Sequence, residues 1–149
     1  MANGKQGFIF NFAISFIIYA VVNSIGYLTR FALYPFGAGL IFLPCMLIAI
    51  GLPTIIYYYS GKKILKLLRN KSQNYLSVSS SFLFAAVVIT YFISFDKISE
   101  FMFFIVSSYG AHGYYSIFTM LLGSEGGMYV LAALPSITMW LGVWKKSRR

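Results

Sequence analysis

Residues 8–28 read FIFNFAISFIIYAVVNSIGYL, a run that contains no charged side chain. An α-helix needs about 20 predominantly apolar residues to cross the hydrocarbon core of a bilayer. The stretch therefore predicts a membrane-spanning helix. The alternation over about ten residues that is typical of outer-membrane barrel strands is missing from the sequence. We therefore predict an all-α membrane protein.

The composition of the chain agrees with this prediction. Of its 149 residues, 59% are hydrophobic and only 10% are charged, whereas soluble domains carry about 25% charged residues. A single small domain has too little interior to bury so many large apolar side chains. The formal net charge is +9, but the cations form clusters beside apolar runs, a pattern typical of membrane topology determinants. We expect them to orient the chain in the membrane and not to bind nucleic acid.

Three further apolar runs predict spans at 38–59, 75–95 and 128–144, so that residues 1–149 form one polytopic membrane domain with four transmembrane helices. Residues 60–74 separate the second and third spans. Apolar side chains alternate with cations there, which predicts a short helix lying on anionic lipid headgroups. The cations of this segment are Lys62, Lys63, Lys66, Arg69 and Lys71.

The distribution of charge favours four crossings over five. With four crossings and a cytoplasmic N-terminus, ten of the 12 Lys and Arg residues lie inside, and only Arg30 and Lys97 lie outside. Five crossings would divide the cations equally. The positive-inside rule favours the first layout, in the cell inner membrane with both termini cytoplasmic. Residues 101–122, polar and glycine-broken in their middle, then form an aromatic outer-face segment, interfacial or re-entrant, between the third and fourth helices.

A polar residue recurs at every fourth position of the first predicted helix. Successive members are offset by about 40° around the axis, so they form a slowly winding stripe. Polar groups avoid lipid, and we expect this stripe to pack against other helices, with a partner-recognition or solute-lining face as the alternative. Its members are Asn11, Ser15, Tyr19, Asn23 and Tyr27. In the last span, Ala132 and Ser136 form a small-xxx-small pair that predicts a close helix contact.

The whole predicted outer connection, residues 96–127, holds all three acids, the only histidine and a cluster of tyrosines. We expect it to recognise a protein partner, because tyrosine is enriched at binding hot spots. A metal site is not expected, since zinc needs three or four protein ligands and His112 is alone; a pH-sensitive or plain aromatic surface is the alternative. The glycine run at 123–127 predicts a flexible turn. The candidate recognition residues are Asp96, Glu100, Tyr109, His112, Tyr114, Tyr115 and Glu125.

The pattern contains no catalytic constellation. No predicted span carries a charge near its centre, which ion-coupled carriers and pumps normally need. Serine chemistry needs a base within hydrogen-bond reach, and the only histidine lies outside the predicted spans. We therefore expect neither enzymatic activity nor a cofactor.

In size, basicity and layout, the chain resembles the TraS entry-exclusion (surface exclusion) family of F-type conjugative plasmids. The features that carry the resemblance are the four predicted spans, the basic segment from Lys62 to Lys71 and the tail from Lys145 to Arg149. The resemblance implies a membrane protein of the recipient cell that blocks redundant DNA transfer by recognising a TraG-like mating-pair protein of the donor.

Two other functions remain open on the sequence. A bacteriocin-immunity protein also lies in the inner membrane, where it intercepts a pore-forming toxin through helix contacts. A small channel or transporter subunit is the third alternative. The sequence leaves the oligomeric state open.

Overall fold

The computed structural model describes residues 4–33, 42–95 and 111–148, with side chains described for 4–25, 51–91, 93–95 and 126–148. Every regular element in these ranges is an α-helix, so the predicted all-α class is confirmed for them. In chain order the helices are α1 (Gly4–Leu33), α2 (Phe42–Lys63), α3 (Lys71–Leu76), α4 (Ser80–Ser94) and α6 (Ala111–Ser147).

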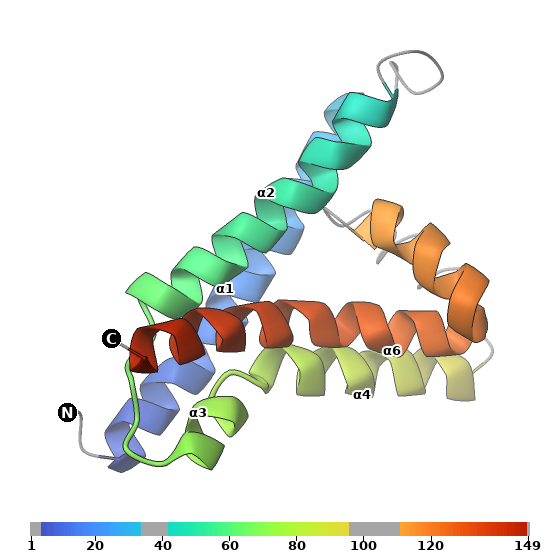
Figure 1. The fold of residues 1–149 in the computed structure, drawn as a ribbon. Coiled ribbons are helices and arrows are strands. Elements are labelled where there is room, and N and C mark those ends of the chain that lie inside the picture. Colours follow the sequence, from blue (N-terminus) through green and yellow to red (C-terminus); the bar gives the residue numbers. More distant parts are fainter. Residues whose placement is uncertain (1–3, 34–41, 96–110, 149) are drawn as a thin grey trace.

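The long helices converge at one end of the molecule (Figure 1). The most extensive contact joins α2 to α6, α4 lies along α6, and α1 makes smaller contacts with both α4 and α2. The N-terminal end of α1, the C-terminal ends of α2 and α6, and the short helix α3 all lie at this end. Segments far apart in sequence therefore share this end of the molecule.

Two helices of the described ranges are long and apolar enough to cross a membrane. They cover Gly4–Ile25 within α1 and Gly126–Ser147 within α6. The apolar part of α4, Ser80–Tyr91, is shorter. With 15 residues, α4 is about 22 Å long, against a hydrocarbon core of about 30 Å.

The helix predicted at 75–95 begins later in the structure. α3 ends at Leu76 and α4 starts at Ser80. Between them, Ser77 Oγ donates to Asn74 O at 3.1 Å, and Ser79 Oγ donates to Leu76 O at 2.8 Å. These bonds accompany the break, where the buried Val78 packs into the same core cluster as Leu65.

The prediction of one short helix within 60–74 was wrong. α2 continues to Lys63, residues 66–68 have no regular structure, and α3 begins only at Lys71. The side chains of Leu65 and Leu68 are buried, whereas those of Lys66 and Arg69 are exposed. Burial of the two leucines fixes the path of the segment through tertiary packing, which local helix propensity does not predict.

The flexible turn expected at residues 123–127 was also wrong, because this run lies inside α6. Gly127 and Met128 are buried, and Met128 packs against Ala85 and Ile89 of α4. Each glycine costs a helix about 1 kcal/mol relative to alanine. Burial of Met128, which directly follows the run, offsets part of this cost. In Figure 1, α6 changes direction between its orange first part and its red remainder.

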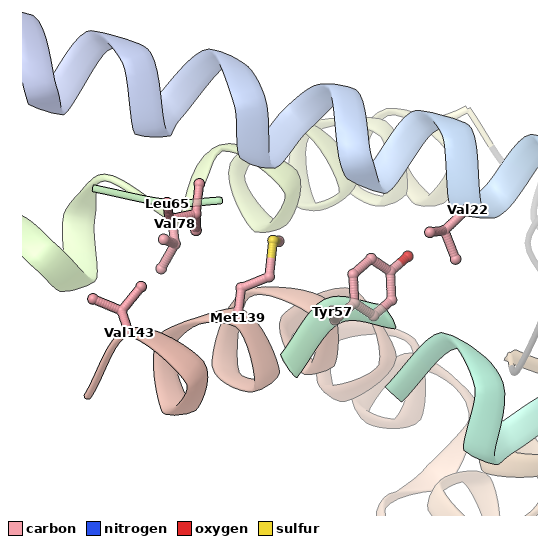
Figure 2. Packing of buried hydrophobic residues seen from close by; sticks show 6 residues of the cluster. All are labelled: Val22, Tyr57, Leu65, Val78, Met139 and Val143. Carbon is pink, nitrogen blue, oxygen red and sulfur yellow. The ribbon is translucent and has the colours of Figure 1, made fainter. Parts of the chain in front are cut away.

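The core of the described region consists of two clusters. The larger one includes Val22 of α1, Tyr57 of α2, and Met139 and Val143 of α6. Figure 2 shows the Tyr57 ring and the Met139 side chain lying between α1 and α6. Leu65 and Val78, on the two sides of α3, complete this cluster. The second cluster joins Ala85 and Ile89 of α4 to Met128 and Ala132 of α6.

Two glycines allow α2 and α6 to approach closely. A Cβ atom added to Gly61 would meet the backbone of Met139, including its carbonyl oxygen, and would lie 2.8 Å from its carbonyl carbon. A Cβ added to Gly142 would meet the carbonyl oxygen of Tyr58 and would lie 3.0 Å from the Cα of Gly61. Since these neighbours are backbone atoms, no rotamer change can make room for the added group.

Candidate functional site

All nine Lys and Arg residues with described side chains come from the segments that converge at one end of the molecule (Figure 1). We name this region the basic end. The described side chains include no Asp or Glu that could neutralise it. The basic end consists of Lys5, Lys62, Lys63, Lys66, Arg69, Lys71, Lys145, Lys146 and Arg148.

Asn11 of α1 fixes the first part of the basic loop, which we define as residues 64–70. Its Nδ2 donates to Lys66 O at 2.8 Å, while Lys66 N donates to Asn11 Oδ1 at 2.8 Å. The same Nδ2 lies 3.3 Å from Ser77 Oγ. Asn11 is fully buried. One side chain therefore bonds to both the N–H and the C=O of a loop residue 55 positions away. These two hydrogen bonds attach the loop to α1.

Asn74 of α3 makes the same kind of clamp two residues further along the loop. Leu68 N donates to Asn74 Oδ1 at 2.8 Å, and Asn74 Nδ2 donates to Leu68 O at 3.0 Å. Both residues are buried. The backbone groups of a non-helical segment must find partners when they are removed from water. The two asparagines supply these partners.

Lys146 provides a third attachment, from α6. Its Nζ donates to Leu65 O at 3.0 Å. Because the carbonyl that this ammonium group contacts lies two residues beyond the end of α2 at Lys63, the ammonium group also complements the negative end of that helix. The basic loop is thus held by α1, α3 and α6, and its geometry is set by the fold.

Aromatic rings lie beside several cations of the basic end. Lys66 Nζ is 4.1 Å from the centroid of the Phe10 ring, and Arg148 Cζ is 3.8 Å from that of Trp144. Trp140 stacks on Tyr75 of α3 with centroids 4.5 Å apart, which joins α3 to α6. Aromatic side chains next to Lys and Arg are typical of the membrane–water interface.

Serine hydroxyls join the helices at two further points. Ser15 Oγ and Ser80 Oγ lie 2.6 Å apart, between α1 and the start of α4. Ser81 Oγ and Ser136 Oγ lie 2.7 Å apart, between α4 and α6. Ala132 is buried in the same α4–α6 contact. The close helix contact predicted from Ala132 and Ser136 is confirmed.

The structure describes the side chains of four of the five residues in the polar stripe of α1. Asn11 and Ser15 are fully buried and bonded as above. Tyr19 packs against both core clusters, and its side chain hydrogen-bonds to Asn23. Tyr27 lies in α1, but its side chain is outside the described set. The structure therefore turns the N-terminal half of the stripe towards the loop and α4.

The residues predicted to recognise a partner fall mostly outside the described side chains. Asp96, Glu100 and Tyr109 lie outside the described residues. His112, Tyr114, Tyr115 and Glu125 lie in the first half of α6, so their backbone is helical, and their side chains are not described. Among the residues that the structure does describe, no group of three or more His, Cys, Asp or Glu residues could hold a metal ion.

Sequence reasoning missed the Asn clamps and the Gly61–Gly142 crossing. The signal for Asn74 was an uncharged polar residue inside a basic segment, and the signal for the glycines was their position within apolar helices. Comparison of the chain with protein-family models, curated proteins and solved structures finds no match.

Proposed function

We propose that the chain is a multi-pass protein of the cytoplasmic membrane, with both termini and the basic loop on the cytoplasmic side. This orientation is supported by the gathering of nine cations at the end where the start of α1, the loop and the end of α6 meet. Cytoplasmic loops carry the excess of Lys and Arg in membrane proteins. The span within α1 is only 17% buried inside the structure, which suits a helix that faces lipid.

We further propose that the protein acts in entry exclusion by recognising a mating-pair protein of an F-type donor cell. The observation that carries this proposal is the basic end itself, in which a central loop and a C-terminal tail form one surface. These are two of the three features on which the resemblance to the entry-exclusion family rests; the third is the set of four predicted spans.

A mating assay tests the proposed function. Recipient cells that produce the protein should accept fewer F-type plasmids than cells with an empty vector, and should accept an unrelated conjugative plasmid at the normal rate. Equal transfer into both recipients, with the protein present in the membrane, would refute the proposal. Protection against a pore-forming toxin would instead identify a bacteriocin-immunity protein, and conductance in liposomes would identify a channel.

We place the recognition surface in the outer segment, residues 96–127, which holds the three acids and the only histidine. Exchange of this segment with that of a related exclusion protein should transfer donor specificity with it. Exchange of residues 60–74 is the matched control, because it replaces a segment on the proposed cytoplasmic side. If specificity followed residues 60–74 instead, recognition would take place in the cytoplasm.

A further inference from the structure

We propose that the basic end is a binding surface for anionic phospholipid, in which headgroup phosphates contact cations of the basic loop and its flanks while exposed apolar side chains enter the acyl region. The proposal rests on the membrane location proposed above and is independent of entry exclusion. It concerns selectivity among lipids, which a membrane location does not by itself imply.

The first support is the fixed geometry of the cations. Both backbone groups of Lys66 and of Leu68 are bonded by asparagine side chains, and the buried Leu65 and Leu68 side chains anchor the loop in the core. Lys63, Arg69 and Lys71 are exposed around this rigid backbone. A preorganised loop loses little conformational entropy when it binds a ligand.

The second support is the apolar surface between the cations. Ile64, which follows Lys63 directly, is 51% exposed, and Leu76, at the end of the short helix that begins at Lys71, is 58% exposed. Tyr75 and Trp144 are also exposed, and both contact Trp140. Cations with exposed aliphatic and aromatic neighbours are typical of surfaces that lie in the headgroup–acyl boundary.

The same observation separates lipid from nucleic acid as the ligand. A nucleic-acid surface binds phosphates with Lys and Arg, and an exposed Ile64 or Leu76 has no partner on a phosphate backbone. A bilayer supplies both the anionic headgroup and the apolar layer that these side chains need. Each cation near an anionic membrane surface contributes about 1 kcal/mol, which is about a fivefold change in binding.

Retention of lipid during purification tests the proposal. The full chain is reconstituted into bilayers of equal parts phosphatidylglycerol and phosphatidylcholine, extracted in mild detergent, and analysed for bound lipid by native mass spectrometry. The wild type should retain phosphatidylglycerol in preference to phosphatidylcholine. The triple variant Lys63→Gln, Arg69→Gln, Lys71→Gln should lose about 100-fold of this preference. Its three positions are exposed and take no part in the Asn clamps, so the fold is expected to persist, as a melting curve will check.

Arg30→Gln is the matched control for Arg69→Gln, because each removes one cation and Arg30 lies in the last turns of α1, far along the helix from Lys5. Only Arg69→Gln should lower the preference, by about fivefold. The proposal is overturned if the triple variant keeps the wild-type preference, or if Arg30→Gln lowers it equally. It is also overturned if duplex DNA displaces the lipid and Ile64→Ser leaves lipid retention unchanged.

These outcomes are distinct from those of the proposed function. A protein that fails to insert into phosphatidylcholine bilayers would contradict the membrane location. A protein that inserts and shows no preference for phosphatidylglycerol would contradict this inference alone. A negative mating assay would contradict entry exclusion alone and would not bear on the lipid preference.

Discussion

Replacement of either crossing glycine by alanine should separate α2 from α6. A Cβ on Gly61 would lie 2.8 Å from Met139 C and 3.1 Å from Met139 Cα, whereas ordinary van der Waals contacts of a Cβ fall at 3.4–4 Å. The helices must therefore part by roughly 1 Å, which forfeits about half of the dispersion energy at each affected contact. Overpacking of this kind costs about 1–3 kcal/mol. The α2–α6 contact is the most extensive in the described ranges, so we expect the upper part of this range.

Gly51→Ala is the matched control, since it makes the same chemical change in the same helix. A Cβ on Gly51 would meet nothing within 4 Å. Alanine is a better helix former than glycine by about 1 kcal/mol, and Gly51→Ala should therefore be neutral or stabilising. Gly61→Ala and Gly142→Ala gain the same helix propensity but lose more through overpacking. The free energy of unfolding of either variant should therefore lie about 3 kcal/mol below that of Gly51→Ala.

Unfolding in detergent, followed through the fluorescence of the two tryptophans, measures the difference. Both residues lie in α6, at positions 140 and 144, close to Gly142. If Gly61→Ala unfolded at the same denaturant concentration as Gly51→Ala, the helices would not cross at these glycines. The double variant Gly61→Ala, Gly142→Ala should cost less than the sum of the single variants, because one separation relieves both clashes.

Three further predictions concern the loop and the histidine. Asn11→Leu should destabilise the protein by about 2 kcal/mol, because it removes three hydrogen bonds worth about 0.6 kcal/mol each in membrane proteins; an unchanged melting temperature in detergent would contradict the clamp. Asn74→Leu should speed tryptic cleavage after Lys66, because the freed Leu68 backbone no longer holds the loop; wild-type cleavage kinetics at equal global stability would show that the loop is held by other contacts. His112→Ala should leave mating exclusion largely intact, because the only histidine offers one nitrogen ligand and neither a metal nor catalysis is expected; a loss of about 100-fold or more, comparable to removal of a general acid or base, would argue for a catalytic histidine.

The helical class and the side of α1 that packs inside the protein were accessible from the sequence, because both depend on local periodicity. A polar residue at every fourth position of an apolar helix lies on one side whatever the helix packs against. The segment that contacts this polar side could not be predicted from the sequence. Asn11 bonds to Lys66 in an irregular loop, and no pattern in either segment encodes a pairing over 55 positions.

The helix ends were mispredicted where tertiary contacts override local preferences. The sequence around Ser77 reads as the start of a span because Tyr75, Leu76 and Val78 are apolar. The serines between and after them bond to the preceding turn, and Val78 is drawn into the core with Leu65. Conversely, the glycine run at 123–127 reads as a turn, but it lies inside α6, directly before Met128, which packs against α4.

The Asn clamps link the packing of the helices to the display of charge at the basic end. Asn11 lies on α1 and Lys146 on α6, and both bond to the backbone of the same loop. Any change that tilts α1 or α6 must therefore move Lys66 and its neighbours, because buried backbone groups cannot lose their partners without cost. The Gly61–Gly142 crossing sets the tilt of α6 against α2. Gly142→Ala should consequently weaken the preference for phosphatidylglycerol as well as the stability, although Gly142 is buried and carries no charge. A variant that lost stability while keeping the full lipid preference would show that the loop holds its cations in place without the helices.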